Sequence, residues 1–104
     1  MSKLVRDLIP EIIPQEKMGL YQFKKVGEEE YNQLLKKKLM EEAMEYTEAE
    51  NIEELADLFE VIDAIIKLKK FDKNDILEVQ RKKREERGGF ENRLLMETVS
   101  SCTV

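Results

Sequence analysis

The sequence predicts an all-α fold, an antiparallel bundle of three main helices that oligomerisation completes. After residue 28, apolar residues recur every three or four positions, which is the spacing of one helix face. Two short segments rich in capping residues interrupt this pattern and divide it into three helices. Charged residues make up 39% of the 104 residues and hydrophobic residues 41%, so we expect one small, highly charged domain over residues 1–104.

Residue types that are missing or rare exclude several kinds of chemistry. The chain has no His, which excludes imidazole catalysis and His-ligated metals, and its one Cys, Cys102, can form no disulfide within the chain. This cysteine usage is typical of the cytoplasm, where we expect the protein. The net charge of −5 disfavours nucleic-acid binding, and no apolar run suits a signal peptide or a membrane span. Catalysis is left to carboxylates, Lys, Arg, Tyr and a bound metal.

Residues 1–27 are predicted to form an irregular N-terminal arm. Both prolines lie here, and Pro10 favours one helical turn because proline suits the first positions of a helix. Residues 20–26 are rich in β-prone side chains, so they predict either a short strand or an extended connector. Gly27 ends the arm.

The first main helix is predicted over about residues 28–47. It begins with three glutamates, which the helix dipole favours at an N-terminus. One face collects the apolar and aromatic residues Tyr31, Leu34, Leu35, Leu39 and Tyr46. In the C-terminal half, charged side chains interrupt this face: Lys38, Glu42 and Glu45 lie within it or on its edge.

The second main helix is predicted over about residues 52–70. Asn51 is a good N-cap, with Glu54 three residues later as in a capping box. Apolar residues cover most of its circumference, so it is predicted to be a central helix. Because the chain is small, we expect helices of another subunit to cover it, in a homodimer or homotetramer. Glu54 and Asp57 continue a mostly buried row.

The third main helix is predicted over about residues 75–87, after a turn in which Asp72 or Asn74 is the cap. Its second half is strongly basic, and Gly88 and Gly89 predict a left-handed C-cap. We expect three apolar residues beyond this helix to pack back on the core: Phe90, Leu94 and Leu95. Residues 97–104 are predicted to form a loose tail.

Four carboxylates lie symmetrically about the turn between the first two helices. Glu42 and Glu45 are three residues apart, as are Glu54 and Asp57, so each pair shares a helix face. The pairs Glu45–Glu54 and Glu42–Asp57 have the same midpoint, so a hairpin brings them level. An all-oxygen set of ligands suits Mg²⁺ or Mn²⁺ rather than Zn²⁺, and substrate phosphates commonly complete the magnesium shell.

Three simpler interpretations compete with a metal site. A solvated charged face is the first, although acidic residues near a helix C-terminus are unfavourable by about 0.3–1 kcal/mol each. The second makes Glu54 the reciprocal partner of the Asn51 cap, which leaves Asp57 unexplained. The third is pairing of Lys38 with Glu42, which contributes only about 0.2–0.5 kcal/mol. The residues alone leave these alternatives open.

At these residues the chain resembles the all-α nucleoside triphosphate pyrophosphohydrolases, the MazG-like superfamily. That family carries EExxE followed by ExxD, which here read Glu41-Glu42-Ala43-Met44-Glu45 and Glu54-Leu55-Ala56-Asp57. The segments KLVRDLIPEII, KLMEEAMEY, EELADLFEVIDAI and RGGF are similar to the small phosphoribosyl-ATP pyrophosphohydrolase-like branch. The resemblance covers about residues 3–95, with a shorter gap between the two motifs than in MazG proper.

The resemblance implies Mg²⁺-dependent hydrolysis of a nucleoside triphosphate, or a related nucleotide, to the monophosphate and pyrophosphate. One role that it implies is the removal of non-standard nucleotides. Carried over by motif position, the metal ligands would be Glu42, Glu45, Glu54 and Asp57. Glu41 and Glu42 would be the catalytic residues, with Glu41 orienting a ligand or a water molecule.

Four basic residues are candidates for contacts to substrate phosphates: Lys38, Arg6, Lys83 and Arg87. Lys38 lies one turn before Glu42, and Arg6 lies in the N-terminal arm. Each candidate also has a simpler role. Arg6 can pair with Asp7 or with a carboxylate at the edge of the core, and the basic end of the third helix complements the helix dipole.

Two other functions stay open. One is the phosphoribosyl-ATP pyrophosphohydrolase of histidine biosynthesis, against which the N-terminal KLVRD segment argues. The other is a catalytically silent helical dimer that acts as a binding or regulatory module. Such a dimer needs the apolar helix faces but does not need the four carboxylates together.

Overall fold

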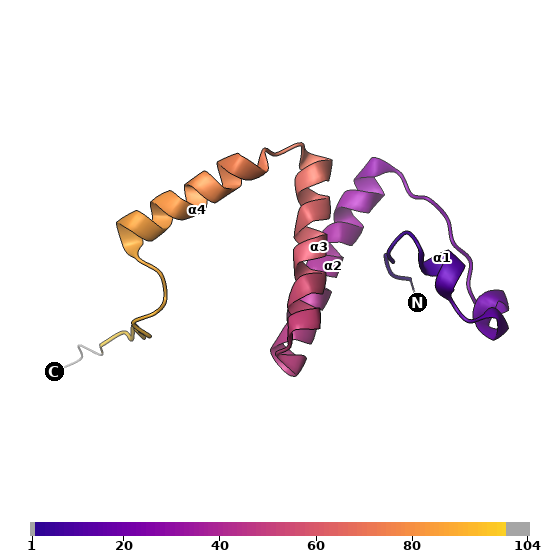
Figure 1. Cartoon of the computed structure of the whole chain (residues 1–104), viewed down its shortest axis with the longest axis horizontal. Helices are drawn as coiled ribbons and strands as arrows, with labels where there is room; N and C mark the ends of the chain where they lie inside the picture. The colour runs from indigo at the N-terminus through magenta and orange to yellow at the C-terminus, as the bar shows by residue number, and fades with distance from the viewer. Residues whose placement is uncertain (1, 100–104) are drawn as a thin grey trace. The chain divides into compact units, whose positions relative to one another are not determined.

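The computed structural model describes residues 2–99 and is helical, with no β-strand in that range, which confirms the all-α class (Figure 1). The chain divides into two compact units, Met1–Phe71 and Asp72–Val104. Between residues 2 and 99, no helix is long and apolar enough to cross a membrane. The single domain over residues 1–104 stays a prediction.

The N-terminal arm contains two short helices. Helix α1 spans Ile9–Ile12 with Pro10 in its first turn, as predicted. A 3₁₀ helix, η1, spans Gln15–Leu20 and was not predicted, because so short a turn has no hydrophobic period that a sequence pattern reveals. Residues 21–27 follow without a strand, so the extended connector is the correct alternative.

Two long helices follow, α2 over Glu28–Ala49 and α3 over Ile52–Lys69. Helix α2 runs two residues past its predicted end and stops at Glu50, which adopts a left-handed conformation with φ of 49°. The predicted N-cap of α3 is confirmed, because the Asn51 side chain accepts a hydrogen bond of 2.9 Å from the backbone N–H of Glu54. The two-residue connection makes α2 and α3 a tight antiparallel hairpin.

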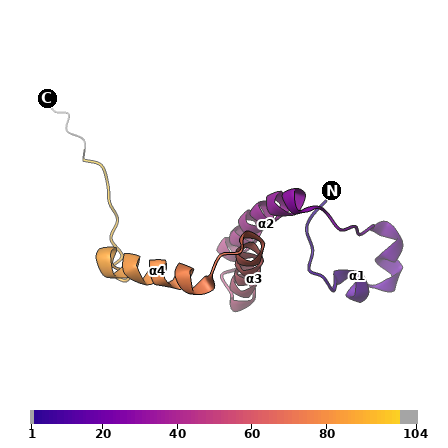
Figure 2. The ribbon, with the colours of Figure 1, turned by 90° about the horizontal axis from the view of Figure 1, so that it is seen from above.

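Helices α2 and α3 lie side by side in both views of the chain (Figures 1 and 2). Among residues 2–99, the hydrophobic residues classed as buried are Leu35 of α2 and Val61 of α3. The other buried residue in that range is charged: Glu42 on α2. The hairpin therefore has a very small core, and a carboxylate occupies part of it.

The second unit contains helix α4 over Lys73–Arg87. Asp72 is its N-cap, accepting a hydrogen bond of 2.8 Å from the Asn74 N–H, so the helix begins two residues before the predicted start. Gly88 ends it with φ of 83° and ψ of 176°. This is an extended conformation that is essentially reserved for glycine, and not the predicted left-handed cap.

The apolar residues beyond α4 are exposed: Phe90, Leu94 and Leu95. Within residues 72–99 there is one helix and an irregular segment, so the second unit offers them nothing to pack against. Their packing on the core, and the place of α4 in a three-helix bundle, stay predictions. In the predicted tail, residues 97–99 are irregular, and residues 100–104, including Cys102, lie outside the described range.

Candidate metal centre

Three carboxylates from two helices meet near the turn of the hairpin. One oxygen from each of Glu42, Glu54 and Asp57 lies within 4.8 Å of the others. A Mg²⁺ ion bound at about 2.1 Å would hold its ligand oxygens about 3–4 Å apart, so small side-chain movements bring these three to bonding distance. The prediction that the hairpin brings Glu42 level with Asp57 is thus confirmed.

Glu42 is the most unusual member, because a carboxylate is here only 7% exposed. Its Oε1 atom pairs with Lys38 Nζ at 3.3 Å. Its Oε2 atom is buried and accepts no hydrogen bond from any described residue. A buried charged oxygen without a hydrogen-bond partner costs about 1–3 kcal/mol or more. A hydrogen-bond donor or a cation bound to this atom would remove that cost.

Glu54 carries a second buried oxygen of this kind. Its Oε2 atom also has no hydrogen-bond partner among residues 2–99. The contact between Glu54 and the Asn51 cap is made by the Glu54 backbone N–H. The cap therefore does not explain this buried carboxylate oxygen, and the interpretation of Glu54 as a capping residue alone is insufficient.

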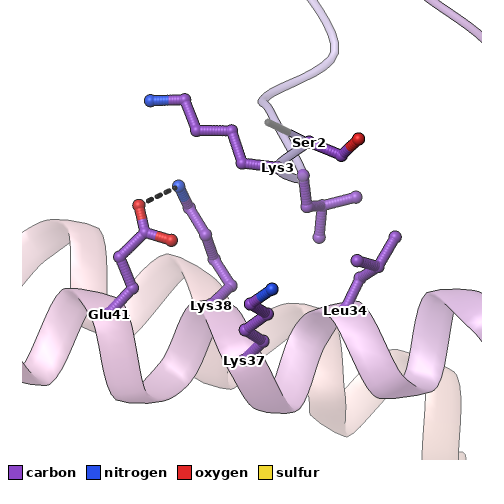
Figure 3. Close-up of a pocket in the computed structure, with 7 residues that line it drawn as sticks. Ser2, Lys3, Leu34, Lys37, Lys38 and Glu41 are labelled. Carbon is purple, nitrogen blue, oxygen red and sulfur yellow. Dashed lines mark hydrogen bonds and ion pairs between the residues drawn. The ribbon is translucent and has the colours of Figure 1, made fainter.

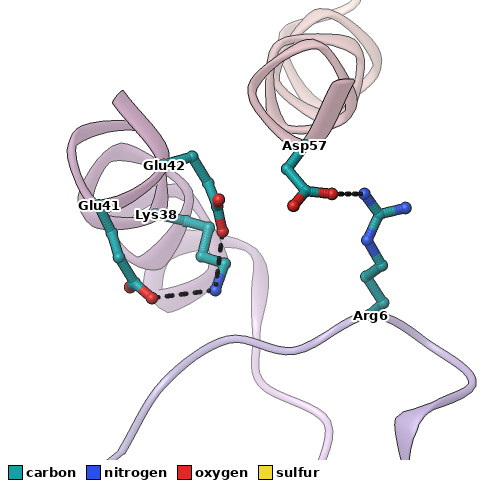
Figure 4. Close-up of polar contacts among 5 residues, drawn as sticks. All are labelled: Arg6, Lys38, Glu41, Glu42 and Asp57. Atoms are coloured by element: carbon teal, nitrogen blue, oxygen red, sulfur yellow. Dashed lines mark hydrogen bonds and ion pairs between the residues drawn. The ribbon is translucent and has the colours of Figure 1, made fainter. Parts of the chain in front are cut away.

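Asp57 is held from the other side by the N-terminal arm. Arg6 Nη2 donates to Asp57 Oδ1 at 2.7 Å, and both side chains are partly exposed (Figure 4). This is the simpler role that the sequence offered for Arg6, pairing with a carboxylate at the edge of the core. The figure shows Asp57 and Glu42 on facing helices, with Arg6 reaching Asp57 from the arm.

Glu41 and Glu45 lie beside the cluster rather than in it. Glu41 accepts a hydrogen bond of 3.2 Å from Lys38 Nζ, so it fixes the lysine that also pairs with Glu42. Glu45 is exposed and is not one of the three carboxylates that meet. Glu45 nevertheless lies close enough to Glu42 to affect the pKa of that carboxyl.

The electrostatics of the cluster follow from these contacts. Burial raises the pKa of the Glu42 carboxyl, and the neighbouring Glu45 raises it further, while Lys38 opposes the shift. Burial works against the charge of Lys38, but its bonds to Glu41 and Glu42 outweigh this and raise the pKa of the amine. Lys38 therefore stays charged at neutral pH, whereas the charge on Glu42 carries a cost that an added cation would relieve.

A groove of about 810 Å³ lies next to the cluster. The arm, α2 and α3 form its walls, and its charged lining includes Arg6, Lys38, Glu42 and Asp57. Further charged residues line it as well, as do apolar side chains such as Leu35; the further charged residues are Asp7, Glu60, Asp63 and Lys67. Sequence reasoning missed this groove, because no periodic pattern shows where an irregular arm lies on a helical hairpin.

The start of the arm also covers α2. Ser2 and Lys3 lie over the helix beside Leu34 and Lys37, around a pocket of about 20 Å³ (Figure 3). Lys38 points toward Glu41 in the same view. This pocket is large enough for one water molecule at most. Its lining shows that the start of the arm packs against α2.

Two of the four candidate phosphate ligands therefore reach the cluster, and these are Arg6 and Lys38. Lys83 and Arg87 are exposed on α4 in the second unit. Their role in binding phosphate stays a prediction.

Comparison of the chain with protein-family models, with curated proteins and with solved structures found no match.

Proposed function

We propose that this protein is a Mg²⁺-dependent nucleotide pyrophosphohydrolase, which releases pyrophosphate from a nucleoside triphosphate or a related nucleotide. The observation that carries the proposal is the buried Glu42, whose Oε2 atom has no partner among the described residues, within a cluster completed by Glu54 and Asp57. The order of EExxE and ExxD motifs, which resembles that superfamily, supports the choice of reaction.

The ligand set fits a hard divalent cation. Its donors are carboxylate oxygens, which suit Mg²⁺ or Mn²⁺. Two buried oxygens, on Glu42 and Glu54, would each gain a partner that residues 2–99 do not supply. Asp57 would be the third ligand, and a rotation of the exposed Glu45 would add the fourth. A bound ion of this kind neutralises phosphate charge and lowers the pKa of a coordinated water molecule.

Lys38 and Glu41 act together on the substrate. Lys38 is held by Glu41 at 3.2 Å and by Glu42 at 3.3 Å, so its ammonium group is fixed at the edge of the cluster. A fixed cation stabilises the charge that spreads over the phosphate oxygens in the transition state. Glu41 is partly exposed and is the carboxylate that orients the attacking water or accepts its proton.

Arg6 has two uses in this proposal. Without substrate its guanidinium neutralises Asp57, as the 2.7 Å contact indicates. When a cation binds Asp57, Arg6 is released to bind a phosphate oxygen, which it recognises by the same charge-assisted hydrogen bonds. The adjacent groove of about 810 Å³ is within the usual size of a small-molecule site, so it accommodates the rest of a nucleotide.

The proposal also includes assembly as a homodimer or homotetramer, a cytoplasmic location and, for the second unit, packing of α4 on the hairpin as the third helix of the bundle. The nucleotide is the one small-molecule partner that the chemistry of the cluster requires.

A pyrophosphate-release assay tests the reaction. The purified chain is supplied with Mg²⁺ or Mn²⁺ and a panel of ribo-, deoxy- and damaged nucleoside triphosphates, together with phosphoribosyl-ATP. We expect release from at least one triphosphate, and loss of release in Glu42→Gln. Glu53→Gln is the matched control, since Glu53 is an exposed carboxylate on α3 next to Glu54. Equal release by Glu42→Gln and the intact chain would overturn the proposal.

A further inference from the structure

Two matching rows of side chains line the groove of about 810 Å³, one row on each helix of the hairpin. Together they are here called the groove floor. On α2 the row is Tyr31, Leu35, Lys38 and Glu42, and on α3 it is Asp57, Val61, Ala64 and Leu68. Both rows have the spacing four, three and four, which keeps their members within about 60° of one another around a helix. All eight residues lie in the first compact unit, so the groove floor is complete within that unit.

The two rows are in register across the hairpin. Each residue of the α2 row is as far from the turn as its counterpart on α3, because every such pair of residue numbers has the same midpoint. The meeting of Glu42 and Asp57 in the cluster fixes this register. The groove floor therefore consists of four layers, which are, from the turn outward, Glu42–Asp57, Lys38–Val61, Leu35–Ala64 and Tyr31–Leu68.

The layers nearest the turn carry the charged groups. Glu42 and Asp57 form the first layer, and their carboxylates belong to the candidate metal centre. Lys38 lies in the second layer, where its Nζ atom pairs with Glu42 Oε1 at 3.3 Å (Figure 4). This end of the groove floor therefore combines a site for a cation with a fixed positive charge.

The layers farther from the turn are apolar and aromatic. Leu35 is 2% exposed, and Ala64, which lies at the same level on α3, is half-buried. The last layer consists of the Tyr31 ring and Leu68, both of which are half-buried. Eleven residues separate Tyr31 from Glu42, so the ring lies about 16 Å along α2 from the cluster. A cation site, a positive charge, an aliphatic surface and an aromatic ring thus follow one another along the groove.

This order is the order of the parts of a nucleotide, which are the polyphosphate, the sugar and the base. We propose that the nucleotide lies lengthwise on the groove floor, with its phosphates at the cluster and Lys38 and its base stacked on the ring of Tyr31. The inference rests on the proposed function and adds to it the position of the base. Every base has a π-face, so an aromatic ring binds a base without reading its hydrogen-bonding edge.

Tyr46 is the alternative stacking residue. It is also half-buried on α2, and it lies one turn beyond Glu42 in the opposite direction from Tyr31. However, Tyr46 is not among the side chains that line the groove, and the aliphatic layer lies on the Tyr31 side of the cluster. The groove floor therefore favours Tyr31, and Tyr46 is its matched control.

Calorimetry with two probes tests the inference, in the full chain saturated with Mn²⁺. One probe is the α,β-methylene analogue of a nucleoside triphosphate, in a purine and a pyrimidine form, and the other is inorganic tripolyphosphate, which has no base. Tyr31→Leu is expected to weaken binding of both analogues about tenfold, since loss of a stacking ring costs about 5- to 150-fold in affinity. It should leave the affinity for tripolyphosphate within about twofold, because it removes no group of the cluster.

Three further variants sharpen the test. Tyr31→Phe keeps the ring, so it is expected to bind the analogues like the intact chain. Ala64→Leu adds bulk to the third layer, so it is expected to weaken binding of the analogues and leave tripolyphosphate unaffected. Tyr46→Leu is expected to leave the affinity for both probes unchanged.

The outcomes that would overturn the inference are distinct from those that would overturn the proposed function. Unchanged affinity of Tyr31→Leu for the analogues, or a larger loss in Tyr46→Leu, would show that the base does not lie on Tyr31. If circular dichroism shows that Tyr31→Leu is less helical than the intact chain, Ala64→Leu decides in its place, and unchanged affinity there overturns the inference. If the intact chain binds neither probe with Mn²⁺, the proposed function itself fails, and the inference fails with it.

Discussion

The two sides of α3 contrast with each other and with an ordinary surface helix. The side that packs against α2 carries Glu54 and Asp57, which meet the buried Glu42. The opposite side carries Ile52 and Phe59, which are largely exposed. In an amphipathic helix the polar residues face water and the apolar ones face the core. In α3, two acidic residues lie on the side that packs against α2, and large apolar residues lie on the side that is exposed.

The contrast supports the proposal that both sides of α3 bind another group. Buried carboxylate oxygens without partners are costly unless a cation binds them, and exposed apolar seams are costly unless a protein surface covers them. The inward side therefore favours a metal ion and phosphate, and the outward side favours a second copy. Changes to the two sides should accordingly be separable in their effects.

The largest effect is expected at the inward side. Asp57→Asn should lower the rate of pyrophosphate release about 100-fold or more, because it removes a charged metal ligand while keeping the shape of the side chain. Ile52→Ser, on the outward side, should leave the release rate per subunit within about threefold at high protein concentration, since its side chain is 86% exposed and is not part of the cluster. Steady-state kinetics measure both. A similar loss of release rate in Asp57→Asn and Ile52→Ser would contradict the view that only the inward side of α3 takes part in the reaction.

The next effect concerns stability. Leu35→Ala should lower the free energy of unfolding by about 2–5 kcal/mol, because it leaves a cavity in a core that has few other members. Ile52→Ala should lower the free energy of unfolding only slightly in dilute solution. The loss should grow with protein concentration, because dimerisation then contributes to stability. Urea denaturation at two concentrations measures these changes. A large, concentration-independent cost for Ile52→Ala would contradict the assignment of the outward side.

Much of this architecture is local, and so it was predictable from sequence. Asn51 and Asp72 cap their helices as their side chains suggest, and equal numbering about the turn brought Glu42 level with Asp57. Long-range features were not predictable. The seating of the arm, and the choice of Asp57 as the partner of Arg6, depend on contacts across 51 residues that no local pattern encodes.

Glu45 shows a second limit of the sequence. The motif makes it equivalent to Glu42, yet the structure exposes Glu45 and buries Glu42. A helical wheel gives the angle between two side chains but not how far the neighbouring helix covers each one. The burial of Glu42, which decides the electrostatics of the cluster, is a property of packing.

The pH dependence of stability provides a third prediction. The pKa of Glu42 is raised above its usual 4.5, so the folded state holds this proton more tightly than the unfolded state. This contribution to stability is present below pH 4.5 and is lost as the pH rises through the folded-state pKa. Without metal, Glu42→Gln carries no carboxyl at this position, so its stability should not fall as the pH rises through that pKa. It should therefore be more stable than the intact chain at pH 7, which thermal unfolding would measure.

Magnesium should make the intact chain more stable than Glu42→Gln. At ten times its dissociation constant, Mg²⁺ should stabilise the intact chain by about 1.4 kcal/mol and leave Glu42→Gln unchanged. If Mg²⁺ stabilised both chains equally, its binding would not involve Glu42.

The smallest expected effect belongs to Arg6. In the absence of nucleotide, Arg6→Ala should tighten Mn²⁺ binding by no more than about fivefold, because a partly exposed ion pair contributes at most about 1 kcal/mol. The same variant should weaken nucleotide binding, since it removes a phosphate ligand. Calorimetry measures both, with Lys3→Ala as a control in the same arm. Weaker Mn²⁺ binding in Arg6→Ala would show that the two cations do not compete for Asp57.

Titration of the metal-free chain with Mn²⁺ by calorimetry tests the central claim most directly, since it requires no substrate. The account predicts saturable binding in the intact chain and in Glu53→Gln, with a loss of affinity of about 100-fold in Glu42→Gln. Absence of saturable binding in the intact chain, or equal affinity in Glu42→Gln, would contradict the assignment of the buried carboxylates to a metal.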